Sequence, residues 1–254
     1  MKKFIFLIVC LVFCNIAISG TMRHDVPEQK FLDFGQKFFC TKKIIGVKQK
    51  ENIKTYAIGT CVILNNNWII TCAHISEEEV DYLTVIVDDK SYVLDQFIVN
   101  KDYDGEKMHS DIALGYRAKG FGEVNGAELY KEKIKLSDYC ALAGFGQHGS
   151  MATGVSGYDG KLRAGTNRVH SFFRQDMILI NGSRDNSRTE LEFLPNVGDS
   201  GGGLFIKGKL AGITSLVLSG GKGNEKADSN YGDEGGFTQI YPHLEWINKY
   251  VKKK

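Results

Sequence analysis

Three short segments of the chain carry side chains that can perform acid–base and nucleophilic chemistry. His74 ends a strand-like run, and imidazole can take and return a proton near neutral pH. Asp111 stands directly before the apolar residues 112–114, where a carboxylate is costly to bury unless a donor such as an imidazole N–H meets it. Ser200 lies within residues 198–202, Gly-Asp-Ser-Gly-Gly. Glycines on both sides of a serine allow a sharp turn in which two backbone N–H groups face one point, as a nucleophile beside an oxyanion hole requires.

Each segment alone has a structural explanation: a hydrogen-bonded histidine at a strand end, a solvated aspartate at a strand start, and a glycine-rich turn. Their order along the chain is His, Asp, Ser. This is the chymotrypsin-type order, and it differs from the orders in subtilisin and the α/β-hydrolases. The three segments together predict a Ser-His-Asp site, because each supplies a partner that the others lack.

The elements that must position these groups are predicted to be strands. The chain has 254 residues, enough for two lobes of about 100 residues each, and its 29 glycines indicate many turns. Between residues 40 and 240, short apolar or alternating runs are bounded by Gly, Asn, Asp and Lys, which predicts an all-β sandwich or a pair of barrels. The clearest runs are residues 61–64, 68–71, 83–87, 92–99 and 177–180. Residues 65–67, three asparagines, predict a tight hairpin turn, and residues 241–251 predict an amphipathic helix.

The N-terminal residues predict a signal peptide. Lys2 and Lys3 precede about ten apolar residues, too few to span a bilayer as a helix. Small residues follow, which predicts cleavage after Ser19 or Gly20 and hence a secreted protein, periplasmic or extracellular, without a membrane attachment. An uncleaved anchor is the alternative.

Charge and motif content exclude several classes of function. The formal charge is +2, and removal of Lys2 and Lys3 with the leader leaves 30 basic and 30 acidic side chains. This balance lacks the basic patch that nucleic-acid binding needs. The six histidines include no closely spaced pair, and neither Cys-x-x-Cys nor His-Glu-x-x-His occurs, so we expect no metal and no cofactor. We also expect a monomer.

The three segments resemble the chymotrypsin/trypsin family of serine endopeptidases, especially its secreted bacterial members. Residues 68–74, Trp-Ile-Ile-Thr-Cys-Ala-His, are similar to that family's Trp-Val-Leu-Thr-Ala-Ala-His. Residues 111–114 match its Asp-Ile-Ala-Leu, and residues 198–202 match Gly-Asp-Ser-Gly-Gly without a change. The likeness runs from about residue 44 to residue 250 and includes weaker similarity at residues 140–146, 163–167 and 212–215.

The resemblance implies two six-stranded antiparallel β-barrels with the active site between them and a C-terminal α-helix on the outside. We expect a signal peptide over residues 1–19 and an N-terminal extension or propeptide over residues 20–43. The first barrel then covers residues 44–128, and the second covers residues 129–254.

The same resemblance assigns the catalytic roles. Ser200 is expected to be the nucleophile, His74 the general acid/base and Asp111 the orienting carboxylate. The backbone N–H groups of Gly198 and Ser200 are expected to hold the oxyanion.

The resemblance also places the substrate-binding residues. Ser215 and Leu216 lie on the strand that would pair with an extended polypeptide substrate. Leu194 stands at the floor of the specificity pocket, where no acidic group is present to attract Lys or Arg. Val217 stands where a glycine often keeps the pocket wall open. We expect polypeptide substrates cleaved after small or medium aliphatic residues, and protein inhibitors as further partners.

The four cysteines outside the leader permit two disulfides in an exported protein. Cys61 and Cys72 flank the hairpin turn and form the predicted cross-strand disulfide. Cys40 and Cys140 are then left over, and free buried thiols are the competing interpretation.

The sequence leaves an alternative open both for how the protein is activated and for what it does. Lys43 and Ile44 faintly resemble the family's activation site, whose freed amine pairs with the carboxylate before the nucleophile, here Asp199. Otherwise residues 44–47 are simply the first strand. A catalytically silent relative that binds peptides or proteins is the alternative function, and a metal-binding exported protein is a third class.

Overall fold

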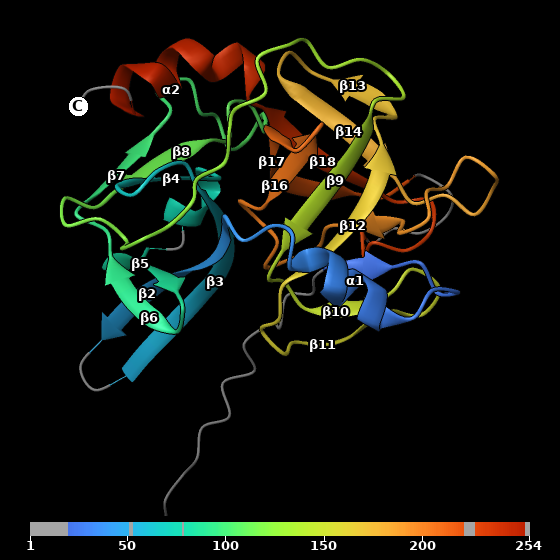
Figure 1. Cartoon of the computed structure of the whole chain (residues 1–254), viewed down its shortest axis with the longest axis horizontal. Helices are drawn as coiled ribbons and strands as arrows, with labels where there is room; N and C mark the ends of the chain where they lie inside the picture. The colour runs from blue at the N-terminus through green and yellow to red at the C-terminus, as the bar shows by residue number, and fades with distance from the viewer. Residues whose placement is uncertain (1–19, 51–52, 78, 221–226, 252–254) are drawn as a thin grey trace, which may run out of the picture.

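The structure is a computed structural model that describes residues 20–50, 53–77, 79–220 and 227–251. The predicted signal peptide therefore lies outside the described residues. Figure 1 shows two β-rich halves side by side, with helix α2 over the first half and helix α1 against the second. Neither helix has the length and apolar content that a membrane crossing needs.

The first half is an antiparallel sheet of seven strands within the described residues. In chain order they are β2 (Thr41–Lys50), β3 (Ile53–Ile63), β4 (Trp68–Thr71), β5 (Tyr82–Val87), β6 (Lys90–Val93), β7 (Gln96–Val99) and β8 (Ala113–Tyr116). The spatial order is β6-β5-β2-β3-β4-β8-β7, so the two edge strands are consecutive in sequence. Only Leu94 and Asp95 join them, and these residues donate backbone hydrogen bonds to Leu83 and Tyr116, respectively. The sheet must therefore curl until its edges meet, which makes it a barrel.

The second half repeats this arrangement. Its strands are β9 (Tyr139–Gly144), β12 (Arg163–Arg168), β13 (Ser171–Phe173), β14 (Met177–Asn181), β16 (Gly203–Ile206), β17 (Lys209–Leu218) and β18 (Glu234–Gln239). The order is β12-β9-β16-β17-β18-β14-β13, and again the two edge strands are neighbours in sequence, joined by Val169 and His170. The predicted all-β fold with two barrels is confirmed, although each sheet has seven strands where six were expected.

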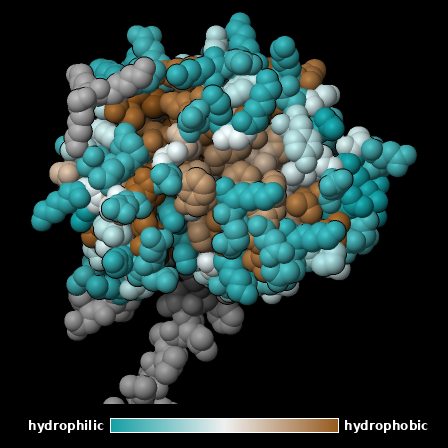
Figure 2. Space-filling model, in the orientation of Figure 1, coloured by the Kyte–Doolittle hydropathy of each residue, from teal (hydrophilic) through white to brown (hydrophobic). Residues whose placement is uncertain are grey.

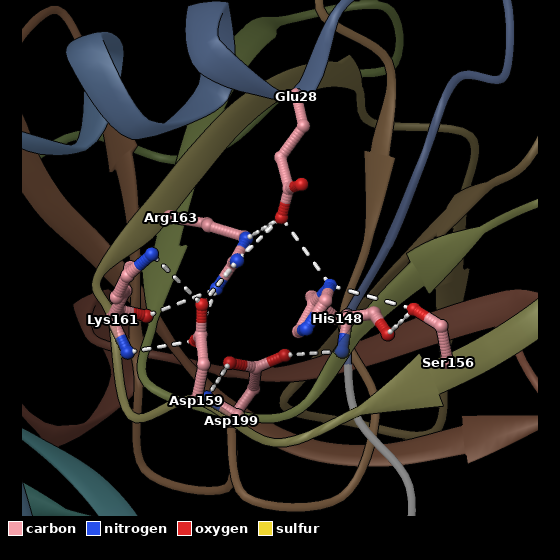
Figure 3. Close-up of polar contacts among 9 residues, drawn as sticks. Glu28, His148, Ser156, Asp159, Lys161, Arg163 and Asp199 are labelled. Atoms are coloured by element: carbon pink, nitrogen blue, oxygen red, sulfur yellow. Dashed lines mark hydrogen bonds and ion pairs between the residues drawn. The ribbon is translucent and has the colours of Figure 1, made fainter.

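Residues 20–43 form ordered structure that the sequence did not predict. β1 (Thr21–Met22) lies between β10 (His148–Ser150) and β15 (Phe193–Leu194) in a four-stranded sheet completed by β11 (Gly154–Gly157). α1 (Glu28–Gly35) packs on β12, with Phe31 fully buried. Figure 3 shows Arg163 between Glu28 and Asp159, and its Nε donates to Glu28 at 2.9 Å and its Nη1 to Asp159 at 2.9 Å. Residues 20–35 are therefore built into the second half, whereas residues 41–43 begin β2 of the first half.

The C-terminal helix is confirmed and packs against the opposite half. After the 3₁₀ turn η2 (Tyr241–His243), α2 (Leu244–Val251) buries Ile247 in a hydrophobic cluster with Trp68 and Ile69 of β4. On the face shown in Figure 2, hydrophilic residues predominate at the periphery and hydrophobic ones gather toward the junction of the halves. A groove lined by aromatic side chains, among them Phe34, Phe38 and Phe205, lies there.

The predicted disulfide between Cys61 and Cys72 is wrong, since all four cysteines of the described residues are free and buried. The hairpin register explains this result. Val62 pairs with Ile70, so Cys61 lies opposite Thr71 and is one position out of register with Cys72. A cross-strand disulfide joins directly opposed residues, and this one-residue offset, with Cys72 beyond the end of β4, removes that pairing.

Candidate active site

His74 is positioned by the turn that ends β4. The strand stops at Thr71, and the chain continues through Ala73 into the single-turn 3₁₀ helix η1 (His74–Ser76). Asp111 Oδ1 accepts the backbone N–H groups of Ala73 at 2.7 Å and His74 at 2.9 Å, and Asp111 Oδ2 lies 2.7 Å from His74 Nδ1. Donation from Nδ1–H to this carboxylate leaves Nε2 as the basic nitrogen of the ring.

Asp111 is a buried carboxylate that both halves of the molecule contact. It is 1% exposed and lies two residues before the start of β8, and Ser215 Oγ of β17 donates to its Oδ2 at 2.6 Å. Burial raises the pKa of Asp111, but the hydrogen bond and charge of His74, together with the Ser215 hydroxyl, hold the pKa below its usual value. The carboxylate is therefore suited to remain ionised beside the imidazole.

Cys72 is a neighbour of the imidazole that was not among the expected site residues. Its sulfur lies 3.6 Å from His74 Nε2 and is fully buried. Burial lowers the pKa of His74, but the Cys72 sulfur and the Asp111 carboxylate outweigh burial, and the net shift is upward. Among the described residues, Cys72, His74 and Asp111 form the one group of potential metal ligands, with their ligand atoms within 4.8 Å of one another. The feature of the sequence that could have indicated this contact is the spacing of Cys72, two residues before His74.

The segment that carries Ser200 lies against β3 and β4 of the first half. Thr60 N–H donates to Ser200 O at 2.8 Å. Gly201 has φ +83°, and a Cβ at this position would lie 2.0 Å from Thr71 Oγ1, so only glycine allows this close approach. The serine is thereby held beside the strand that leads to His74. Within the described contacts, however, the Ser200 hydroxyl makes no hydrogen bond to the imidazole.

The turn before Ser200 leaves two backbone N–H groups unpaired. Gly198 has φ +90°, and its carbonyl accepts a hydrogen bond from Thr60 Oγ1 at 2.8 Å. Asp199 N–H donates to Asn196 O at 3.0 Å, whereas the N–H groups of Gly198 and Ser200 have no protein acceptor in the described part of the chain. Two free N–H groups that flank one residue are what an oxyanion hole requires.

Asp199 is buried against the N-terminal segment. Its Oδ2 accepts N–H bonds from Gly20 at 2.9 Å and Asn196 at 3.1 Å, and its Oδ1 accepts one from Gly146 at 2.9 Å. Burial raises the pKa of Asp199 to about 6, although these amides oppose the shift. A Cβ on Gly20 would lie 2.4 Å from the Phe193 ring, so a larger residue at this position would require the ring to move. Figure 3 shows Asp199 below the Arg163 cluster.

Ile44 lies within strand β2, and the described hydrogen bonds of the Asp199 carboxylate do not include it. It pairs with Gly59 of β3 and Val85 of β5 and is fully buried within the sheet. The hydrogen-bond partner that Asp199 takes from the N-terminal part of the chain is Gly20.

The predicted pocket residues lie on two strands of the second half. A register shift between Thr214 and Leu216 marks a bulge that turns Ser215 toward Asp111, and Leu216 and Val217 follow on β17 with partial exposure. Leu194, in β15, is fully buried in a hydrophobic cluster of the second half.

The arrangement of these residues defines a chymotrypsin-like serine endopeptidase. The chain belongs to the trypsin family, whose model matches residues 22–247. It is 28% identical to Kallikrein-1E2 of Equus caballus over 222 residues, which cover 76% of this chain and 79% of the relative. It is 30% identical to an uncharacterized peptidase of Corynebacterium glutamicum over 130 residues, 51% of this chain and 42% of that protein.

A solved structure shows the same fold. Neuropsin, a serine protease expressed in the limbic system of mouse brain, superposes with a TM-score of 0.62 and 19% identity, and the match covers 90% of this chain and 97% of that chain. These comparisons agree with the expected enzyme class.

Proposed function

We propose that the chain is a secreted serine endopeptidase in which Ser200 attacks the scissile carbonyl. The observation that carries this proposal is the buried Asp111 carboxylate bonded to His74 Nδ1 at 2.7 Å, next to a turn with unpaired N–H groups at Gly198 and Ser200. His74 Nε2 takes the Ser200 proton during attack and later delivers it to the leaving amine. The two N–H groups stabilise the tetrahedral oxyanion. Catalytic hydrogen bonds are often long without substrate, and we expect the Ser200–His74 contact to tighten when a peptide binds.

A polypeptide substrate would extend along β17, with its specificity side chain near Leu216 and Val217. Leu194 supplies no charge to this region. We therefore propose a preference for small or medium aliphatic residues.

The decisive experiment compares the mature chain with its Ser200→Ala variant. We expect the parent to react with a fluorophosphonate and to cleave a peptide library mainly after aliphatic residues, and the variant to lose the label and about 10⁶-fold of the turnover. A folded parent that neither labels nor cleaves would favour the silent peptide-binding alternative, and cleavage mainly after Lys or Arg would contradict the proposed pocket.

Secretion and activation are proposed to be one event. Hydrolysis of the Ser19–Gly20 bond adds water across the peptide, which leaves a carboxylate on the leader and an α-ammonium group on Gly20. The Gly20 nitrogen already lies 2.9 Å from Asp199 Oδ2, so the new cation would form at the buried carboxylate. A buried carboxylate is much more stable with a cation than with neutral donors alone. Asp199 lies between Gly198 and Ser200, so fixing its side chain also fixes the two oxyanion N–H groups.

The residues that follow Gly20 are proposed to stay in the mature enzyme. β1 lies between two strands, and Arg23 donates to Glu192 O through its backbone N–H at 3.0 Å and to Thr189 O through Nη1 at 3.0 Å. His24 Nδ1 lies 2.7 Å from the Tyr231 hydroxyl. These contacts hold the Gly20 nitrogen at Asp199 and support an extension over residues 20–43 in place of a propeptide.

A further inference from the structure

Cys72 faces the nitrogen of His74 that the proposed mechanism needs as a base. We propose that Cys72 Sγ and His74 Nε2 form an inhibitory site for a divalent cation that binds thiolates, such as Zn²⁺. This inference rests on the proposed function only for the inhibition, since the binding is independent of catalysis.

The distance between the two ligand atoms suits tetrahedral zinc. Zinc–sulfur bonds of about 2.3 Å and zinc–nitrogen bonds of about 2.1 Å at a tetrahedral angle place sulfur and nitrogen about 3.6 Å apart. Cys72 Sγ and His74 Nε2 are 3.6 Å apart. A cation bonded to both atoms therefore requires no change in their separation.

Asp111 orients the imidazole for metal binding as well as for catalysis. Its Oδ2 lies 2.7 Å from His74 Nδ1, which fixes the tautomer that has a lone pair on Nε2. A carboxylate that accepts a hydrogen bond from the other ring nitrogen makes a histidine a more basic zinc ligand and fixes the orientation of its ring. The Asp111 oxygen remains with the ring and Ser215, so the protein supplies two ligand atoms and water completes the coordination.

The cysteine gives this site its selectivity. Thiolate and imidazole together favour Zn²⁺ over the hard cations Mg²⁺ and Ca²⁺. Binding converts the Cys72 thiol to a zinc-bound thiolate and releases its proton to solvent, with no change of oxidation state. The His74 side chain is 28% exposed, which leaves a path for the ion from the surface.

Occupancy of the site would stop catalysis directly. The lone pair of Nε2 cannot accept the Ser200 proton while it is bonded to a metal ion. Zinc therefore lowers the fraction of active enzyme, and a chelator restores it.

The other described cysteines differ in their surroundings: Cys140, for example, is buried and its thiol donates to Asn167 O at 3.4 Å.

Calorimetric titration of metal-free Ser200→Ala protein with Zn²⁺ tests the binding without proteolysis. We expect one site whose affinity falls at least tenfold in Cys72→Ala and in the similarly sized Cys72→Ser, and is unchanged in Cys140→Ala. Mg²⁺ should give no binding. Titration with Co²⁺ should produce a thiolate-to-metal absorption band that Cys72→Ala lacks. Equal zinc affinity in the Cys72 variants, or no binding in any form, would overturn the proposal.

Activity measurements on chains with Ser200 separate the two proposals. Zinc should inhibit the parent and Cys140→Ala, a chelator should reverse the inhibition, and Cys72→Ala should require at least tenfold more zinc. Equal inhibition of all three would contradict the assigned site. A chain that binds zinc through Cys72 but never cleaves peptides would refute the proposed function and leave the metal site standing.

Discussion

Two buried aspartates at the junction of the halves have opposite surroundings. Asp111 has an imidazole and a hydroxyl as partners, whereas Asp199 has backbone N–H groups of Gly20, Gly146 and Asn196. The pKa of Asp111 is lowered, and burial raises that of Asp199 to about 6. Burial is therefore not what distinguishes them. Their pKa values differ because Asp111 contacts an imidazole, which can carry positive charge, whereas the described partners of Asp199 are neutral backbone N–H groups.

Under the proposed activation, Asp111 has its charged partner before the leader is removed, whereas Asp199 gains one only afterwards. Asp111 can remain charged as it stands. Asp199 lacks a contacting cation in the described structure, and the nearest group that could become one is the Gly20 nitrogen. Three changes test this contrast, beginning with the largest expected effect.

Replacement of Asp111 with Asn should lower kcat about 10⁴-fold, because the amide no longer selects the tautomer with a basic Nε2. The steady-state rate on a cleaved peptide measures this loss, and circular dichroism checks that the variant folds. Asp102→Asn, on an exposed carboxylate that pairs with Lys101 at 3.5 Å, is a control expected to stay near the parent rate. A loss below about tenfold in Asp111→Asn would show that Asp111 does not orient His74.

One additional alanine before Gly20 should lower kcat/KM about 10²- to 10³-fold, the cost of leaving a buried carboxylate without its cation. The matched comparison is a chain whose first residue is Gly20, with active sites counted by fluorophosphonate labelling. Equal activity of the two chains would contradict activation by leader removal.

The same pair of chains should differ in the pH dependence of stability. With an amide at Gly20, the folded pKa of Asp199 is about 6 and exceeds the unfolded value of 3.8. The folded state then binds the proton more tightly, so the free energy of unfolding falls as pH rises from about 4 to 6. An α-ammonium group lowers the folded pKa and reduces this loss, which urea unfolding across that pH range would measure.

Cys72→Ala should produce the smallest change, a shift of the acidic limb of kcat/KM toward lower pH. The Cys72 sulfur raises the pKa of His74, and the base must be neutral to act. The assay should contain a chelator so that metal binding does not contribute, and Cys140→Ala is the control. A limb that stays in place or moves to higher pH would show that the sulfur does not influence the imidazole.

The sequence predicted the parts of this molecule that have local signals. The all-β fold and the helix near residues 241–251 followed from short apolar runs and their spacing. The family, and with it the two barrels, followed from the resemblance of residues 68–74, 111–114 and 198–202. Glycine at position 201 was expected to serve a sharp turn, and the structure shows the close contact with Thr71 that requires it.

Features that depend on long-range packing were not predictable in this way. β1 has two residues and gains its order from β10 and β15, which lie more than a hundred residues away in sequence. The Cys61–Cys72 pairing depended on a register that a hairpin sequence alone leaves uncertain by one residue. The Gly20–Asp199 contact joins residues 179 positions apart, and no local pattern marks it.

The two chain ends are exchanged between the halves. β1, near the start of the chain, belongs with the second half, whereas α2, at its end, covers the core of the first half through Ile247. The first half therefore cannot complete its interior during synthesis until α2, more than a hundred residues beyond β8, has emerged. After a single cut in the connection between β8 and β9, we expect the two fragments to stay associated. The N-terminal fragment would keep β1 packed on the second half, and the C-terminal fragment would keep α2 packed on the first.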